Sequence, residues 1–370
     1  MNFRILTLNA LLLASASTLA EAPTIRSVDM FYKTGEYYRA YGNHYDPLDA
    51  TTRFNVPTGL IKPPGENLLW DFSTGPTTVV HRFDYIDPTG SWEALDFPLA
   101  TVAEKKTVEG TGEVAWLFFD PAPGVGRVVY GFYDELFAPY TPSSVFEPSI
   151  VDFPETIRYN QTWATDMTVY STIAYSDPEA SAVFPVKLDF HSTFKADAWG
   201  TALLPGIGVV DVLRINETQS VDISIDVAVD PSQEGSYTYF ETDYLRNYYW
   251  LSPGHGIVAQ LNSSQGSFTP DNEFATATAF LRMFETNKET DPVDNTVQPA
   301  PDLQVIISNG KVLVKWGDAP NASRYRVEYS DNPTNPASWQ PVGTETTDKL
   351  ILDPTGPSQS ARFYRVVSLP

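Results

Sequence analysis

The four histidines of the chain are scattered, and their spacing builds no metal centre. His44, His81, His191 and His255 show neither the His-x-x-x-His nor the His-Glu spacing of zinc sites. The chain has no cysteine, which excludes disulfides, thiolate metal ligands and a cysteine nucleophile. It also lacks a Gly-x-Ser-x-Gly elbow and a phosphate-binding Gly-Lys-Ser/Thr loop. We therefore predict no catalytic residue and no cofactor, and the sequence favours a protein that is not an enzyme.

Carboxylates are abundant, with 46 Asp and Glu residues, but the sequence nominates no catalytic pair. A glycosidase needs two acids that the fold brings to about 5–9 Å, which sequence spacing does not reveal. Asp222, Asp226 and Asp230 share one side of a predicted strand, where successive members lie about 13 Å apart. One strand cannot gather them around calcium, so we interpret them as a solvated face that resists edge-to-edge aggregation. A calcium site elsewhere stays open, without assigned ligands.

Aromatic residues provide the one candidate binding site. Tyr244, Tyr248 and Trp250 share a face of the predicted strand that enters the turn at residues 251–256. Such a row can stack on sugars or line an apolar cavity, and it can equally belong to the core. Exposure separates these alternatives, because core rings are covered, whereas a binding platform has bare rings flanked by acids.

These residues belong to the stretch 203–260, around which the chain is organised. In residues 221–230, Val and Ile alternate with Asp and Ser, which predicts an antiparallel strand with one buried face. Pro-Gly turns at 205–206 and 253–254 bound this region.

Similar alternation predicts strands across the rest of the chain, at residues 65–73, 79–85, 114–119, 127–132, 304–308, 311–316, 323–330, 349–352 and 362–367. Residues 273–285 combine the two-residue alternation of a strand with the spacing of a helix, and we predict a strand there. No segment keeps a 3.6-residue apolar stripe, and 30 Pro and 22 Gly mark frequent turns. The fold class is therefore predicted as all-β, with a large antiparallel curved-sheet or sandwich domain and a small β-sandwich.

Charge and the N-terminal segment indicate the environment of the protein. The net charge is −22, and from residue 299 onward seven basic and seven acidic residues balance, so the acidic excess precedes that point. Such a surface repels nucleic acid and anionic lipid. Residues 1–20 have the pattern of a secretory signal peptide, which predicts a mature N-terminus near Glu21. No later segment is apolar for long enough to span a bilayer, so we expect a secreted or cell-envelope protein, most consistent with a Gram-negative bacterium.

Composition divides the mature chain into two domains. Residues 288–301 are polar, rich in Pro and without periodicity, which is typical of a linker. The predicted order is a signal peptide at 1–20, a large acidic β domain at 21–287, the linker, and a small module at 302–370.

The small module resembles the fibronectin type III family. The resemblance is carried by residues 312–316, which include Trp316, by residues 325–330, and by Phe363-Tyr364-Arg365-Val366. It implies a β-sandwich whose second, third and sixth strands are these segments. The sequence stops at Pro370, where the family would add a seventh strand, which predicts an unpaired edge on residues 362–367.

The large domain resembles an uncharacterised β domain of bacterial secreted proteins, and loosely the curved sheets of envelope lipid-handling proteins. The segments that carry the resemblance are residues 67–73, 159–163, 198–206, 210–214 and 248–254. Neither resemblance implies a catalytic residue. We expect a secreted or cell-surface, non-enzymatic protein with a binding or scaffolding domain and a terminal spacer or docking module. A protein that binds a glycan, an apolar ligand or a cell-surface component is the alternative, followed by a glycoside- or polymer-degrading enzyme.

Overall fold

The computed structural model describes residues 21–30, 33–43, 49–134, 143–176, 181–226, 235–288, 300, 302–308, 311–317, 319, 322–333, 335, 338–355 and 362–369. The chain separates into two compact units, Met1–Thr290 and Asp291–Pro370. The predicted signal peptide and most of the predicted linker lie outside the described residues. Within these ranges the one α-helix, α1 (Ser27–Met30), has four residues, and no helix is long and apolar enough to cross a membrane. The all-β prediction is confirmed.

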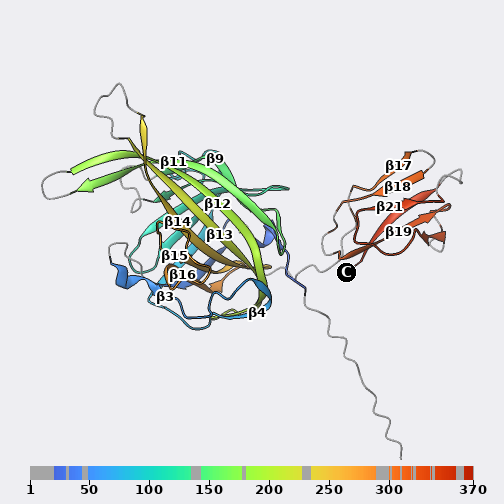
Figure 1. The fold of residues 1–370 in the computed structure, drawn as a ribbon, viewed down its shortest axis with the longest axis horizontal. Helices are drawn as coiled ribbons and strands as arrows, with labels where there is room; N and C mark the ends of the chain where they lie inside the picture. Colours follow the sequence, from blue (N-terminus) through green and yellow to red (C-terminus); the bar gives the residue numbers. More distant parts are fainter. Residues whose placement is uncertain are drawn as a thin grey trace, which may run out of the picture. The chain divides into compact units, whose positions relative to one another are not determined.

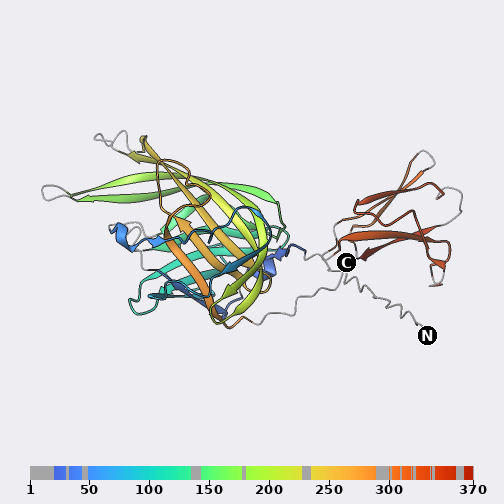
Figure 2. The same cartoon turned by 60° about the horizontal axis from the view of Figure 1, so that its bottom comes forward.

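The first unit is a barrel of 12 antiparallel strands whose sheet closes on itself (Figure 1). The order around the barrel is β11-β9-β8-β7-β6-β5-β2-β16-β15-β14-β13-β12, and β12 pairs with β11 to complete the circle. Figure 2 shows these strands inclined around the barrel. The bounds are β2 (Tyr37–Gly42), β5 (Val79–Ile86), β6 (Val102–Val108), β7 (Val114–Ala122), β8 (Gly126–Asp134), β9 (Ser143–Pro154), β11 (Thr162–Ser176), β12 (Ser181–Leu204), β13 (Gly208–Asp226), β14 (Tyr237–Ser252), β15 (Gly256–Ser263) and β16 (Thr276–Thr286).

The predicted large antiparallel curved sheet is thus present, and the structure adds that it is closed. The strands predicted at 79–85, 114–119 and 127–132 are β5, β7 and β8, and the ambiguous segment 273–285 forms β16. Alternation explains their formation, because in β5 every second residue is buried from His81 onward. Closure removes most of the unpaired edge that an open sheet would present.

Two of the pairings around the barrel, β2 with β16 and β9 with β11, are called seams here. β2 pairs with β16 in a long-range register that places Tyr41 opposite Arg282, and the backbone N–H of Tyr37 donates to Asn287 at 2.6 Å. The other seam, between β9 and β11, has one register pair, Thr168 with Glu147. In both views the hairpin of β11 and β12 extends beyond its neighbours, so part of β11 lies past this seam (Figures 1 and 2).

A short strand, β4 (Gly65–Asp71), lies against the barrel and pairs in parallel with β12. The close approach requires Gly200, because a Cβ there would lie 1.9 Å from the carbonyl oxygen of Leu68. β4 brings Trp70 and the following Phe72 onto Trp250, with edge-to-face ring centroids 6.0 and 4.9 Å away. A two-residue strand, β3 (Phe54–Asn55), pairs with β16 nearby, and the 3-10 helix η1 (Ala50–Thr52) precedes it.

The N-terminal segment of the described chain packs into a hydrophobic cluster at the barrel. It contains β1 (Ile25–Arg26), which pairs with β10 (Thr156–Ile157), and α1. Ile25 and Met30 are buried in the same cluster as Trp199, Leu213 and Ile215. The residues just after the predicted cleavage point are therefore part of the folded structure.

The second unit consists of two three-stranded antiparallel sheets, ordered β17-β18-β21 and β20-β19-β22. The bounds are β17 (Gln304–Ser308), β18 (Lys311–Lys315), β19 (Arg324–Ser330), β20 (Gln340–Pro341), β21 (Leu350–Asp353) and β22 (Phe363–Leu369). Val314 of β18 and Tyr325 and Val327 of β19 share one buried cluster, so the sheets face each other. The strands predicted in this unit are confirmed. Among the described residues β22 pairs with β19 alone, which leaves its other edge without a strand.

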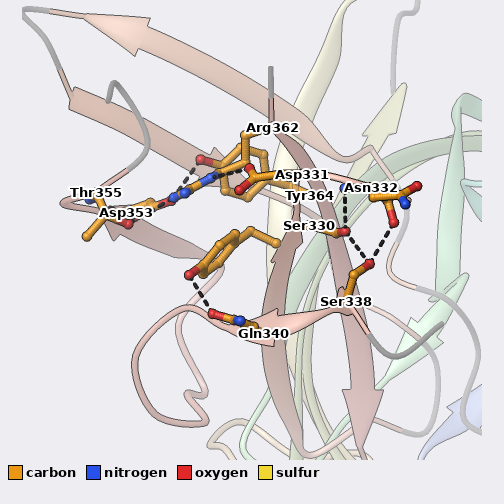
Figure 3. A network of polar contacts seen from close by, with 10 residues as sticks. Ser330, Asp331, Asn332, Ser338, Gln340, Asp353, Thr355, Arg362 and Tyr364 are labelled. Carbon is orange, nitrogen blue, oxygen red and sulfur yellow. Dashed lines mark hydrogen bonds and ion pairs between the residues drawn. The ribbon is translucent and has the colours of Figure 1, made fainter. Parts of the chain in front are cut away.

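A polar network joins the two sheets of this unit (Figure 3). Asp353, buried at the end of β21, accepts hydrogen bonds from Tyr364 at 2.8 Å and from Arg362 at 3.1 Å, both from the segment that forms β22. The other Asp353 oxygen accepts from the backbone N–H and the hydroxyl of Thr355, each at 2.8 Å. The Arg362 guanidinium also lies over the ring of Tyr329, 3.9 Å from its centroid.

Candidate ligand-binding site

The predicted aromatic site on β14 is largely covered. Tyr248 and Trp250 are buried, and Tyr244 is half-buried. The Tyr248 hydroxyl donates to the carbonyl of Asn272, and Phe274 stacks on its ring. By the criterion of exposure these two rings belong to the core. Ligand binding by this row of three aromatic residues stays a prediction. Of the three rings, only that of Tyr244 is partly exposed.

The described histidines lie on separate elements. His81 is buried on β5, where burial and nearby Lys106 lower its pKa to about 4. His191 of β12 lies 2.8 Å from Asp166, and His255 is in the turn after β14. Within the described ranges no group of three His, Asp or Glu residues could hold a metal ion. His44 lies outside these ranges.

The aspartates of β13 differ from the predicted solvated row. Asp222 accepts a hydrogen bond from Thr242 at 2.5 Å and remains partly exposed. Asp226 is buried and accepts from the backbone N–H of Gly235, so the solvated-face interpretation is wrong for this residue. The reason is local: the return of the chain at Gly235 covers the carboxylate. Asp230 lies outside the described residues.

An exposed apolar surface that borders two grooves lies on the loop between β5 and β6, residues 87–101. Here Trp92, Leu95 and Leu99 are 58%, 77% and 68% exposed. The loop is anchored from below by Phe97, whose ring stacks on Phe118 of β7 at 4.4 Å. Turn hydrogen bonds support it, including that from the Phe97 N–H to the Ala94 carbonyl at 2.9 Å. The loop therefore holds three apolar side chains in water on a fixed support.

Trp92 lines a polar groove of about 370 Å³. The Trp92 ring meets Tyr133 of β8 edge-to-face at 5.0 Å, which fixes its orientation. On the groove floor the ammonium of Lys105 lies 4.9 Å from the ring centroid of Trp116. The lining residues are Trp92, Glu93, Lys105, Thr111, Gly112, Glu113, Val114, Trp116 and Tyr133. The groove thus combines a bare indole with two carboxylates and an ammonium group.

Trp92 also lines a second groove, of about 490 Å³, which is mainly apolar. It is lined by Pro88, Thr89, Gly90, Ser91, Trp92, Ala94, Leu95, Phe97, Pro98 and Ala100. We call these the polar groove and the apolar groove. A third groove, of about 440 Å³ at β3, offers one ring, Phe54, which is stacked on Phe280 at 4.8 Å. The Trp92 region is therefore the better candidate for a binding site.

Sequence reasoning missed this site because residues 87–101 have no strand alternation and contain Pro88 and Pro98. A signal was present: Trp92, Leu95 and Leu99 are large apolar residues in a segment that reads as a loop. Loops carry function more often than the strands that they connect.

A buried polar cluster inside the barrel is a second concentration of titratable groups. Glu217 of β13 accepts hydrogen bonds from Ser192, Asn247 and Tyr249 at 2.8–2.9 Å. Burial raises the pKa of Glu217 more than these donors lower it, and Asp152 of β9 raises it further. Because β9 and β13 are not neighbours in the sheet, this face points inward, and Tyr248 and Trp250, which alternate with Tyr249, point outward.

The cation of this interior cluster is Arg127. It donates to Asp152 at 3.0 Å and lies 3.9 Å from Glu104, which accepts a hydrogen bond from Tyr85 at 2.5 Å. Burial alone would lower the pKa of Arg127, but its two acidic neighbours raise it. A permanently charged arginine thus holds the two carboxylates around it.

The raised pKa of Glu217 predicts a pH-dependent stability. Below the carboxyl pKa of the unfolded chain, near 4.5, Glu217 is neutral in the folded and the unfolded state, and its contribution to the free energy of unfolding is fully present. As pH rises, Glu217 loses its proton more readily in the unfolded chain than in the folded one. This contribution to stability is therefore lost as pH passes through the higher pKa of the folded state. Glu217→Gln, which carries no charge at any pH, should therefore gain stability over the wild type as pH rises from 4 to 8, measured by urea denaturation. Glu241→Gln, an exposed site on β14, is the control. A pH-independent difference for Glu217→Gln would contradict this expectation.

No protein-family model matches the chain, and no curated protein matches it.

Proposed function

We propose that the chain is an exported, non-enzymatic glycan-binding protein, in which the polar groove beside Trp92 receives a sugar. The observation that carries the proposal is the bare Trp92 ring, held on an anchored loop and flanked by Glu93 and Glu113. This arrangement meets the criterion that separates a binding platform from a core aromatic residue.

The chemistry of the groove suits a polyol. The flat apolar face of a sugar ring packs on an indole, and burial of both surfaces drives association. Sugar hydroxyls are donors and acceptors, so they pair with the carboxylates of Glu93 and Glu113 and with the Lys105 ammonium. The groove volume lies within the range of about 300–1,000 Å³ that is typical of small-ligand sites.

The second unit is proposed as a fibronectin-like spacer or docking module. Its two three-stranded sheets and their shared core support this role. Export is proposed from the pattern of residues 1–20 and from the absence of cysteine in a chain with a strongly acidic barrel domain.

Trp92→Ala is expected to weaken glycan binding about 10- to 100-fold, because loss of one buried apolar side chain removes about 1.5–3 kcal/mol. The measurement is isothermal titration calorimetry with the oligosaccharide that most raises the melting temperature in a panel of neutral, amino and acidic glycans. Trp92→Phe should retain most of the affinity, since it keeps a ring.

The control for this experiment is Tyr239→Ala. Tyr239 is 61% exposed, which is close to the 58% of Trp92, but it lies on β14 and outside the groove. Equal loss of affinity in both variants, or a panel in which no glycan raises the melting temperature, would refute glycan binding in this groove.

Hydrolysis of a glycoside is the second candidate, because Glu93 and Glu113 line the same groove and glycosidases use two carboxylates. Release of reducing ends from the bound oligosaccharide, lost in Glu113→Gln while binding persists, would establish it. A glycan recovered intact after prolonged incubation would leave binding alone.

A further inference from the structure

The polar and apolar grooves are adjacent, and Trp92 lines both of them. The polar groove is lined by Glu93, Lys105 and Glu113, and the apolar groove by Leu95 and Pro98. A molecule that packs on Trp92 can therefore reach hydrogen-bonding groups in one groove and hydrocarbon in the other. A ligand that is itself amphiphilic matches this pair of grooves.

The exposure of the leucines is not needed to hold the loop. Phe97 provides the anchor by stacking on Phe118, and the loop closes its own turns by backbone hydrogen bonds. Leu95 and Leu99, which are 77% and 68% exposed, add little to that anchor. Each large apolar side chain left in water forgoes the stabilisation that burial would give. Leu95 lines the apolar groove together with Trp92 and Pro98, and contiguous apolar surface is typical of an interaction site.

Charge selects the headgroup. The polar groove has two carboxylates and one ammonium, and it belongs to residues 1–298, which carry the acidic excess of the chain. A phosphate or carboxylate headgroup would be repelled by this field, whereas an uncharged polyol is not. The hydrocarbon tail would occupy the apolar groove, whose volume of about 490 Å³ is larger than that of the polar groove.

We propose that the two grooves form one site for an uncharged glycolipid, with the sugar headgroup in the polar groove and the alkyl chain in the apolar groove. This inference rests on the proposed function and narrows its ligand class. Binding of the sugar part alone would satisfy the proposed function without it.

Matched glycosides separate the two ideas. The full-length protein is titrated with methyl and n-octyl β-glucoside, β-galactoside and β-maltoside, and with n-octyl tetraethylene glycol ether, all below their micelle concentrations. For at least one sugar, the octyl glycoside should bind at least tenfold more tightly than both its methyl counterpart and the ether. Leu95→Ala should lower the affinity for that octyl glycoside by about tenfold. Leu69→Ala, at a leucine on β4 that is 61% exposed and outside both grooves, should not.

Each outcome of these titrations supports or overturns the glycolipid site. Equal binding of methyl and octyl glycosides overturns the inference and leaves the glycan-binding function standing. An ether that binds as tightly as every octyl glycoside overturns it as well, because the headgroup would then contribute nothing. If no octyl glycoside binds, the inference fails, and the wider glycan panel decides the proposed function separately.

Discussion

Arg214→Met is expected to lower the free energy of unfolding of the barrel by about 3–5 kcal/mol, the range for breaking a buried ion pair. Arg214 of β13 is fully buried and donates to Asp197 at 2.8 Å. It also donates to the carbonyls of Ile61 and Lys62, which precede β4, and it lies over the ring of Tyr248 at 4.8 Å. The substitution leaves a buried carboxylate and two carbonyls without this partner.

Urea denaturation followed by tryptophan fluorescence measures this effect, and two further variants define its cause. Adding Asp197→Asn should recover part of the loss, because it removes the unpaired charge and still accepts a hydrogen bond from Asn216. Lys187→Met, which breaks the partly exposed pair with Asp189, should change stability by less than about 1 kcal/mol. If Lys187→Met and Arg214→Met were equally stable, burial would not be the source of the effect.

Asp353→Ala is expected to destabilise the second unit by about 2–4 kcal/mol. It leaves Arg362, Tyr364 and Thr355 without their shared acceptor, and each lost hydrogen bond to a charged group is worth about 1.5–3 kcal/mol before relaxation. In hydrogen exchange on the full-length protein, protected amides of β18, β19 and β22 should exchange about 30- to 1,000-fold faster. Exchange in the barrel strands should not change.

The acid dependence of this unit follows from the same carboxylate. Burial alone would raise the pKa of Asp353, but the hydrogen bonds from Thr355, Tyr364 and Arg362 lower it below its usual value. Its stabilisation is therefore present above the unfolded-state pKa and is lost as pH falls through the lower folded-state pKa. Asp353→Asn should weaken this acid dependence, and Asp348→Asn, at an exposed position, should not. Identical acid profiles in all three proteins would show that Asp353 does not carry it.

Local pattern predicted β5, β7, β8 and the main strands of the second unit, but it predicted no strand at β6, β9, β11, β12 or β15. Long-range pairing decided how the strands are arranged. Alternation in residues 79–85, 304–308 and 311–316 depends on neighbours in sequence, which the sequence displays. Closure depends on the pairing of Tyr41 with Arg282, which no local period encodes. An open curved sheet and a closed barrel therefore have the same strand pattern.

The candidate site shows the same limit. Tyr248 and Trp250 share the outward face of β14. Trp250 is covered because β4 pairs with β12 at Gly200, and Tyr248 is covered by Phe274. Trp92 is exposed because Phe97, and not Trp92, anchors the loop by packing on Phe118. Which ring is covered depends on tertiary contacts of segments far apart in sequence, so residue type and spacing did not distinguish them.

The seam between β2 and β16 joins the first and the last strand of the barrel in chain order. β2 is the first strand of the barrel to be made and β16 the last, so a growing chain has open sheet edges until residues 276–286 arrive. Pairing across such a sequence separation is slow, and open edges of separate chains can join meanwhile. The acidic excess lies before residue 299, in the part that is made first. Unfinished chains therefore carry a net negative charge, and like charge opposes their association.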